Sequence, residues 1–400
     1  MKAWRGPITS AIAVMAVGIG LGCFGAGGAA LAGPSCPDGS IKVGAVSTIT
    51  GPADFSEVPK AAKAVFDQLN AKGGIDGCKI DYTIEDDKAD PQAATQAARD
   101  LVDNKGVVVM AGSASLLECQ VNAGYYSQRK ILSIQGLGVD PACYNSPNIS
   151  PVNVGPYVLS TAMLDYATNT LKLKKLCAFF IIIGGTQDAY KQAVVDWEKQ
   201  TGQKLALYDP TLPFQGDYTP YLLKARAAGC QGVLFNTIEP QVVQVVKTAD
   251  AQKMHGIDWL FLSPGYTVQV AKALAHTLQT VYAGTEWEPY TNSTSPANRE
   301  WREALSAAHE PLTAFTQAGF EAAKILIQVI QGINGPVTRE SMTKALHDMK
   351  PIPNSLVGTP YYFGPGMKHA SSQATKIVTR ENGAGKVVTP NWVILPPAKD

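Results

Sequence analysis

Residues 41–115 alternate between strand-like and helix-like stretches, and this alternation constrains the fold more than any other feature. They read IKVGAVSTITGP, a helical stretch ending in NAKGGIDG, then KIDYTIEDDKADPQAATQAARDLV and GVVVMAGSAS. Such an order predicts a parallel sheet flanked by helices, with ligands held beyond the carboxyl ends of the strands. The loops expected at those ends, TGPADFSE and AGSAS, contain few catalytic side chains. The segment predicts a unit that holds a small molecule without transforming it.

The two helices of this segment have recognisable apolar stripes and end signals. Gly73 and Gly74 end the first helix, and Asp90 followed by Pro91 provides an N-cap carboxylate and a first-turn proline for the second. The first helix has one stripe at i, i+3, i+4 and i+7, made of Ala62, Val65, Phe66 and Leu69.

A second series of alternating elements begins near Lys174, so two similar lobes are expected in tandem. Its strand-like stretches are LCAFFIII, KLALYD, QGVLFN, DWLFLS and TVYAG. A long apolar helix follows, AFTQAGFEAAKILIQVIQG, and then a helix capped by Thr338. ATKIVTRENG and KVVTPNWVIL read as two final strands. The net charge of +1, without a basic stripe interleaved with aromatic residues, excludes nucleic acid as a partner.

The N-terminus has the features of an export signal. Lys2 and Arg5 precede an apolar run over residues 8–21, and residues 30–32 (Ala-Leu-Ala) form a small-x-small cleavage site. We therefore expect a signal peptide at residues 1–32, cleavage after Ala32 and a periplasmic protein. The alternative is a lipid anchor on Cys23.

Six cysteines remain after that leader, an even number that suggests disulfides in an exported chain. Their places at the ends of neighbouring predicted strands favour three pairs, each stabilising the fold by about 2–4 kcal/mol. The predicted pairs are Cys36–Cys78, Cys119–Cys143 and Cys177–Cys230. No C-x-x-C or H-x-x-x-H spacing is present, so no metal site is expected.

No constellation of residues indicates catalysis. The carboxylates at residues 85–87 end a strand and are interpreted as structural. Residues 184–187 (GGTQ) lack the spacing of a nucleotide-binding loop, so no nucleotide cofactor is expected. Ser113 and Ser115 have no G-x-S-x-G elbow and no evident histidine partner, which disfavours an exported hydrolase. Both hydroxyls are candidates for hydrogen bonding to a ligand.

The chain resembles the periplasmic Leu/Ile/Val-binding protein family, the type I solute-binding receptors of branched-chain amino acid ABC transporters. VGAVSTITGP, NAKGGIDG, DDKADPQAA, VVVMAGSAS, KILSIQG and AFTQAGFEAAKIL carry the resemblance, which covers residues 38–395. It implies a two-lobed α/β fold with three hinge crossovers. The N-terminal lobe would comprise residues 38–156 and 287–366, and the C-terminal lobe residues 157–286 and 367–400.

The resemblance also implies a ligand cleft between the lobes. By position, the ligand contacts fall on Phe55, Ser56, Ser113, Ala114, Ser115, Leu137, Gly138, Gln187, Thr237, Glu239, Tyr266 and Phe315.

Two departures from the family bear on the ligand. Leu116 and Val139 stand where amino-acid receptors usually have hydroxyl residues, and no acid follows Pro264 to pair with an α-ammonium group. A buried ammonium without a carboxylate partner is costly. We therefore expect a small organic acid, amide or aromatic ligand, with Tyr266 filling the space near the missing acid. The alternative is a branched-chain amino acid, with Glu239 in the acidic role.

The resemblance implies a monomeric receptor that hands its ligand to an ABC permease in the membrane and needs no cofactor. A module of the same fold that presents a signal molecule to a membrane sensor is the alternative function.

Overall fold

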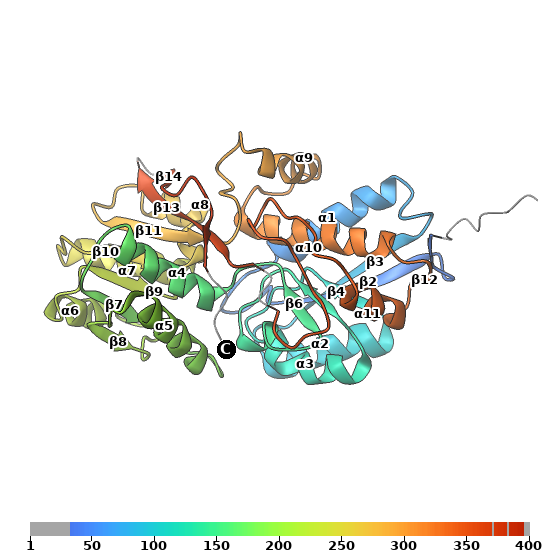
Figure 1. The fold of residues 1–400 in the computed structure, drawn as a ribbon, viewed down its shortest axis with the longest axis horizontal. Helices are drawn as coiled ribbons and strands as arrows, with labels where there is room; N and C mark the ends of the chain where they lie inside the picture. The colour runs from blue at the N-terminus through green and yellow to red at the C-terminus, as the bar shows by residue number, and fades with distance from the viewer. Residues whose placement is uncertain (1–32, 370–371, 382–383, 396–400) are drawn as a thin grey trace, which may run out of the picture. The chain divides into compact units, whose positions relative to one another are not determined.

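The computed structural model describes residues 33–369, 372–381 and 384–395, so the predicted signal peptide and Cys23 lie outside the described residues. Within these ranges no helix combines the length and apolar character required to cross a membrane. Two separate sheets, each flanked by helices, dominate the fold (Figure 1). This confirms the predicted two-lobed α/β architecture. A short parallel pair, β1 (Pro34–Ser35) with β12 (Gly335–Pro336), forms a third, two-stranded sheet.

The first sheet has five strands in the order β3-β2-β4-β5-β6, and every neighbouring pair is parallel. The strands are β2 (Ser40–Ser47), β3 (Lys79–Asp86), β4 (Val109–Ala111), β5 (Ser133–Gln135) and β6 (Ile149–Pro151). The helices of this lobe are α1 (Glu57–Ala71), α2 (Pro91–Arg99), the π-helix η1 (Asp100–Asn104), α3 (Glu118–Arg129), the 3₁₀ turn η2 (Pro141–Cys143), η4 (Pro296–Asn298), α9 (Arg299–Ala307), α10 (Ala314–Gln331) and α11 (Arg339–His347).

Helices cover both faces of this sheet, and successive residues of its central strands β2, β4 and β5 are buried against them. Val43 and Ile134 belong to a core shared with α1 and α10, whereas Val46 and Met110 belong to a core shared with α2 and α3. Asp90 caps α2 as predicted, by accepting hydrogen bonds from the backbone N–H groups of residues 92 and 93. The predicted cap at Thr338 is also present, and Gly332 is the C-cap residue of α10.

Helices α1 and α10 pack closely at a glycine. A Cβ added to Gly319 would lie 1.8 Å from the Val58 carbonyl oxygen, so only glycine allows this approach. The apolar stripe predicted on α1 packs into the same core, with Phe66 fully enclosed and Leu69 partly buried at its edge. A segment from late in the chain therefore completes the core of the first lobe.

The second sheet has the order β14-β13-β11-β10-β9-β7-β8, and β15 pairs with β13. Strands β7 to β11 run parallel, whereas β13 is antiparallel to β11 and to β14. The strands are β7 (Leu176–Phe179), β8 (Leu207–Asp209), β9 (Gly232–Phe235), β10 (Asp258–Phe261), β11 (Thr280–Thr285), β13 (Ala374–Glu381), β14 (Ala384–Val387) and β15 (Val393–Ile394). The helices of this lobe are α4 (Pro156–Asn169), α5 (Gln187–Thr201), α6 (Thr219–Ala227), α7 (Glu239–Ala251), the 3₁₀ turn η3 (Ser263–Gly265) and α8 (Val268–Ala273).

Alternation along the strands of the second sheet creates two cores. Phe179, Phe235 and Phe261 pack with residues of α6, α7 and α8, whereas Phe180 and Leu260 face α4 and α5. Successive side chains of a strand point to opposite faces, so one run of apolar residues supplies both cores.

One predicted strand is divided. The stretch KVVTPNWVIL was expected to form a single strand, but it forms parts of β14 and β15 with an interruption at residues 388–392, which include Pro390. Proline has no N–H group to donate to a ladder, so it interrupts a strand. The backbone N–H of Val388 still donates to the Ile377 carbonyl oxygen over 2.9 Å, which keeps the interrupted segment against β13.

The chain passes between the two sheets three times: after β6, after β11 and before β13. Polar contacts connect these passages. The Glu286 carboxylate accepts hydrogen bonds from Asn153 (2.8 Å), the Gly155 backbone N–H (2.9 Å) and Ser263 (2.7 Å). Lys376 and Glu288 form an ion pair of 2.7 Å whose side chains are 11% and 5% exposed. The crossovers are therefore joined by buried charged groups.

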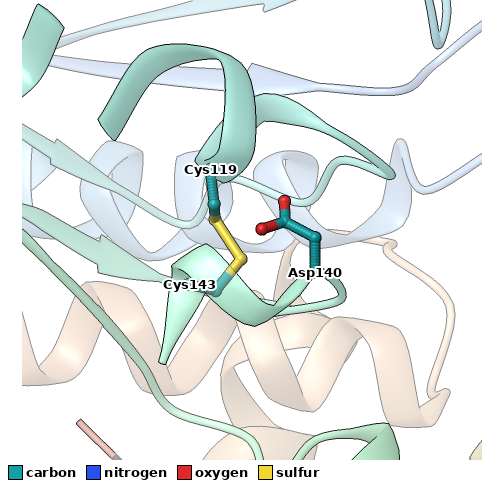
Figure 2. A group of neighbouring side chains, drawn as sticks. All are labelled: Cys119, Asp140 and Cys143. Atoms are coloured by element: carbon teal, nitrogen blue, oxygen red, sulfur yellow. A yellow bond between two sulfur atoms is a disulfide. The ribbon is translucent and has the colours of Figure 1, made fainter. Parts of the chain in front are cut away.

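The three predicted disulfides are present: Cys36–Cys78, Cys119–Cys143 and Cys177–Cys230. Asp140 lies beside the second of them (Figure 2). Both sulfur atoms there are bonded to each other and cannot serve as thiolate ligands. The Asp140 carboxylate accepts hydrogen bonds from the Gln120 and Ala142 backbone N–H groups, while burial raises its pKa to about 6. This group is a disulfide with a capping carboxylate.

A buried carboxyl group in the first lobe makes stability depend on pH. Burial raises the pKa of Glu118 from 4.5 to about 8, against the hydrogen bonds from Tyr126 (2.7 Å) and Gln135 (2.9 Å), and the nearby Asp87 and Asp140 carboxyls raise it further. The folded state therefore binds this proton more tightly than the unfolded state. Its contribution to stability is complete below pH 4.5 and is lost as pH rises through about 8, at up to about 1.4 kcal/mol per pH unit.

We expect Glu118→Gln to flatten this dependence, because the amide cannot ionise. Chemical unfolding at pH 5 to 9 checks this: the wild-type midpoint should fall more steeply with pH than that of the variant. Glu340→Gln, at an exposed position of α11, is the control and should follow the wild type. Parallel curves for Glu118→Gln and the wild type would contradict the prediction.

Candidate ligand-binding site

A cavity of about 190 Å³ lies where loops from both sheets meet. One wall comes from the loop after β2 and the first turns of α1 and α10, and the opposite wall from the start of α7 and the segment after β10. The lining residues are Asp54, Glu57, Glu239, Tyr266, Thr267, Gln269, Tyr290, Thr313, Ala314 and Phe315. The loops after β2, β9 and β10 follow the carboxyl ends of parallel strands, where such folds place ligands.

The cavity is acidic. Asp54, Glu57 and Glu239 line it, and none of the described lining residues is Lys, Arg or His. Burial raises the pKa of Glu57, although its carboxylate accepts a hydrogen bond from Thr313 over 2.5 Å. Burial also raises the pKa of Glu239, and the Glu57 carboxyl adds to that increase by repulsion. Like charges held in a common site favour a cation between them.

Aromatic rings form the remaining walls. The Tyr266 and Tyr290 ring centroids are 4.7 Å apart, and those of Phe315 and Phe55 are 5.7 Å apart. The Tyr266 hydroxyl lies 2.5 Å from the Thr291 hydroxyl, which fixes the ring's orientation. Aromatic faces carry partial negative charge and attract cations. The aromatic rings and the carboxylates of this cavity therefore both favour a ligand with a positive charge.

Three predicted contact residues line this cavity: Glu239, Tyr266 and Phe315. Phe55 lies behind Phe315, and Ser56 is buried, its hydroxyl accepting a hydrogen bond from Lys60 (3.2 Å). The structure thus brings the predicted residues of the first loop, α7, the segment after β10 and α10 to one place.

The predicted residues of the AGSAS loop lie elsewhere and have internal partners. Ser113 accepts a hydrogen bond from the Val46 backbone N–H (3.1 Å). Ser115 donates to Asp87 and accepts from the Glu118 backbone N–H (2.9 Å), at the start of α3. Ala114 bridges to Leu137 in the sheet. These hydroxyls satisfy backbone groups, a use that sequence alone does not distinguish from ligand contact.

The other predicted residues are also outside the cavity lining. The Gly138 backbone N–H donates to Asn153 over 2.8 Å. Gln187 is exposed at the start of α5. Thr237 is buried, and its hydroxyl has no hydrogen-bond partner in the described part of the chain.

Glu57 is the residue that the sequence reasoning missed. An acid in the first turn of a helix is ordinary, because it interacts favourably with the helix dipole, and no neighbouring motif indicates a ligand role for Glu57. Tyr290, which follows β11, also lines the cavity and is not among the predicted contacts. The proximity of Glu57 to Glu239 depends on the tertiary structure.

The family described as "Periplasmic binding protein" matches residues 40–384, so the chain belongs to this family. It is a solute-binding protein of the type I fold.

Curated relatives agree with that assignment. The chain is 24% identical over 339 residues to the Leu/Ile/Val-binding protein homolog 3 of Brucella melitensis, covering 82% of this chain and 88% of the relative. It is 25% identical over 303 residues to the Leu/Ile/Val-binding protein of Escherichia coli, covering 72% and 78%.

Solved structures share the fold. A branched-chain amino acid ABC transporter protein of Thermus thermophilus with bound valine has a TM-score of 0.76, at 14% identity over 89% of this chain and 97% of that one. A fatty acid ABC transporter substrate-binding protein of Thermomonospora curvata also has a TM-score of 0.76, at 19% identity over 91% and 95%.

Proposed function

We propose that this solute-binding protein captures a small molecule with an ammonium group, an amino acid or an amine, and delivers it to an ABC permease. The observation that carries the proposal is the joint presence of Glu57 and Glu239 in one aromatic-walled cavity. Glu239 supplies the carboxylate that is missing after Pro264. A carboxylic acid without an ammonium group would meet three carboxylates and no basic side chain among the described lining residues.

The names of the relatives support an amino-acid ligand. Leu/Ile/Val-binding proteins are among the curated relatives, and one structural neighbour contains valine. A cavity of about 190 Å³ suits a ligand of that size better than a long chain. The aliphatic or aromatic part of the ligand would lie against Phe315, Tyr266 and Tyr290.

Binding would act through both lobes. Glu57, Thr313 and Phe315 belong to elements of the first lobe, whereas Glu239 and Tyr266 follow strands of the second. A ligand that touches both groups stabilises the form in which they are close, and a permease can recognise that form. The protein would act without catalysis, in the periplasm after cleavage at Ala32 or through a lipid anchor on Cys23.

The ammonium group is the feature to test. Leucine, valine and phenylethylamine are compared with N-acetyl-leucine, N-acetyl-valine and N-acetyl-phenylethylamine by thermal shift and calorimetry. We expect at least one free amine to stabilise the protein, and its acetylated form to bind at least about 10-fold more weakly. Equal binding of the free and acetylated forms would contradict the proposal.

A further inference from the structure

A second cavity, of about 250 Å³, lies beside the second sheet, between α8, the strands β11, β13 and β14, and the segment after β11 that contains Tyr290 and Thr291. Its lining differs in charge from the first cavity, because it contains Lys272 and Arg380 and, among the described lining residues, no carboxylate. Its apolar lining residues are Val268, Ala271, Val281, Ala283 and Val378, and its hydroxyl-bearing ones are Tyr266, Thr267, Tyr290, Thr291 and Thr379.

Arg380 is the unusual residue of this cavity. One terminal nitrogen, Nη2, donates to the Ala271 carbonyl oxygen over 3.0 Å. The Nε and Nη1 atoms are buried and have no hydrogen-bond partner among the described residues. Burial lowers the pKa of the guanidinium below its ordinary value. A buried charged donor without a partner is costly, so an anion beside it would be stabilised.

The two cavities adjoin at Tyr266. Tyr266, Thr267 and Tyr290 line both of them. The Tyr266 ring lies against the backbone of β14, since a Cβ added to Gly385 would be 2.5 Å from Tyr266 Cε2. Bulk at position 385 would displace the ring, so glycine there keeps the partition between the acidic and the basic cavity in place.

We propose that the cavity lined by Arg380 is a second binding site, which takes a small monocarboxylate with an apolar body. Arg380 pairs with the carboxylate, Lys272 adds positive charge at the exposed edge, and the valine and alanine side chains surround the apolar body. Inorganic phosphate fits less well, because it has no apolar part to contact the five aliphatic side chains that line the cavity. The site is independent of the ammonium-binding function proposed for the first cavity.

The test uses phenylacetate as the probe, with phenylacetamide and inorganic phosphate for comparison, in calorimetry on the purified protein. We expect phenylacetate to bind at least about 10-fold more tightly than either comparison compound, and Arg380→Gln to weaken it by at least about 10-fold. Arg226→Gln, at an exposed position of α6, is the matched control and should leave phenylacetate binding unchanged.

Two further measurements separate this site from the first cavity and from a structural role of Arg380. Glu239→Gln should leave phenylacetate affinity within about 2-fold of the wild type, because that carboxylate lies in the other cavity. The ligand-free Arg380→Gln protein should melt at or above the wild-type temperature, because the variant removes two buried donors without partners among the described residues, Nε and Nη1, at the loss of one hydrogen bond to Ala271.

Four results would overturn the proposal. They are undetectable phenylacetate binding at millimolar concentration, unchanged phenylacetate affinity in Arg380→Gln, loss of that affinity in Glu239→Gln, and tighter binding of phosphate than of phenylacetate. None of them bears on whether an amine binds the acidic cavity, so the two proposals fail separately.

Discussion

Glu239→Gln is expected to weaken the binding of the ammonium ligand by about 10- to 100-fold. A hydrogen bond to a charged group contributes about 1.5–3 kcal/mol, and each 1.4 kcal/mol is a factor of ten in affinity. Glu239 is partly buried in the acidic cavity, so solvent screens its charge less than that of a surface carboxylate. Calorimetry with whichever free amine stabilises the wild-type protein measures the change.

Two more variants locate the ammonium group. Glu57→Gln should weaken binding in the same range, whereas Asp54→Asn, at an exposed position of the same cavity, should change it by no more than about 3-fold. Affinity should also fall on acidification from a higher pH than for an ordinary carboxyl, because the pKa values of Glu57 and Glu239 are both raised. Unchanged affinity in both glutamine variants would exclude the acidic cavity as the ammonium site.

Lys376→Met is expected to destabilise the protein by about 3–5 kcal/mol, because it leaves the Glu288 carboxylate buried without its partner. The ammonium of Lys376 also lies 5.2 Å from the centre of the Trp392 ring, a contact that the variant loses. The free energy of unfolding, from denaturant titration followed by circular dichroism, measures the loss. The effect is large because both charged groups are almost fully enclosed where two crossovers meet.

A double variant and an exposed pair provide the controls. Lys376→Met with Glu288→Gln should recover much of the lost stability, because no charge then remains unpaired. Lys344→Met removes the partner of Asp348 on the exposed face of α11, where the side chains are 79% and 63% exposed, and should cost less than about 1 kcal/mol. Equal losses for Lys376→Met and Lys344→Met would show that burial of the crossover pair does not matter.

Local patterns predicted the fold because each of them has a local physical cause. The stripe on α1 and the Asp90 cap follow from helical spacing and from the backbone N–H groups at a helix start. The cysteine pairs followed from the placement of their residues at the ends of neighbouring strands. The division of the last predicted strand at Pro390 also has a local cause, because proline has no N–H group to donate to the strand ladder.

The site was less predictable because polar side chains at strand ends have two competing uses. Ser113 and Ser115 look like ligand-binding hydroxyls in sequence, yet both satisfy backbone N–H groups of their own lobe. Glu57 looks like an ordinary first-turn acid, yet it lies near Glu239. Which of these side chains remain free to contact a ligand depends on how the lobes pack, and no local sequence pattern predicts that packing. The sequence could not predict that two nitrogens of Arg380 lack partners in the described part of the chain, because this also depends on how the chain packs.

The close approach of α10 to α1 at Gly319 has a consequence for the order of synthesis. The strands of the first sheet leave the ribosome early, but the helix that covers α1 is made only after the whole series from β7 to β11. The second sheet is likewise incomplete until β13, which is made late in translation, can pair with β11. Neither lobe can therefore finish folding during translation of its own first segment. A chain cut after residue 155 would leave the apolar face of α1 uncovered and prone to aggregation.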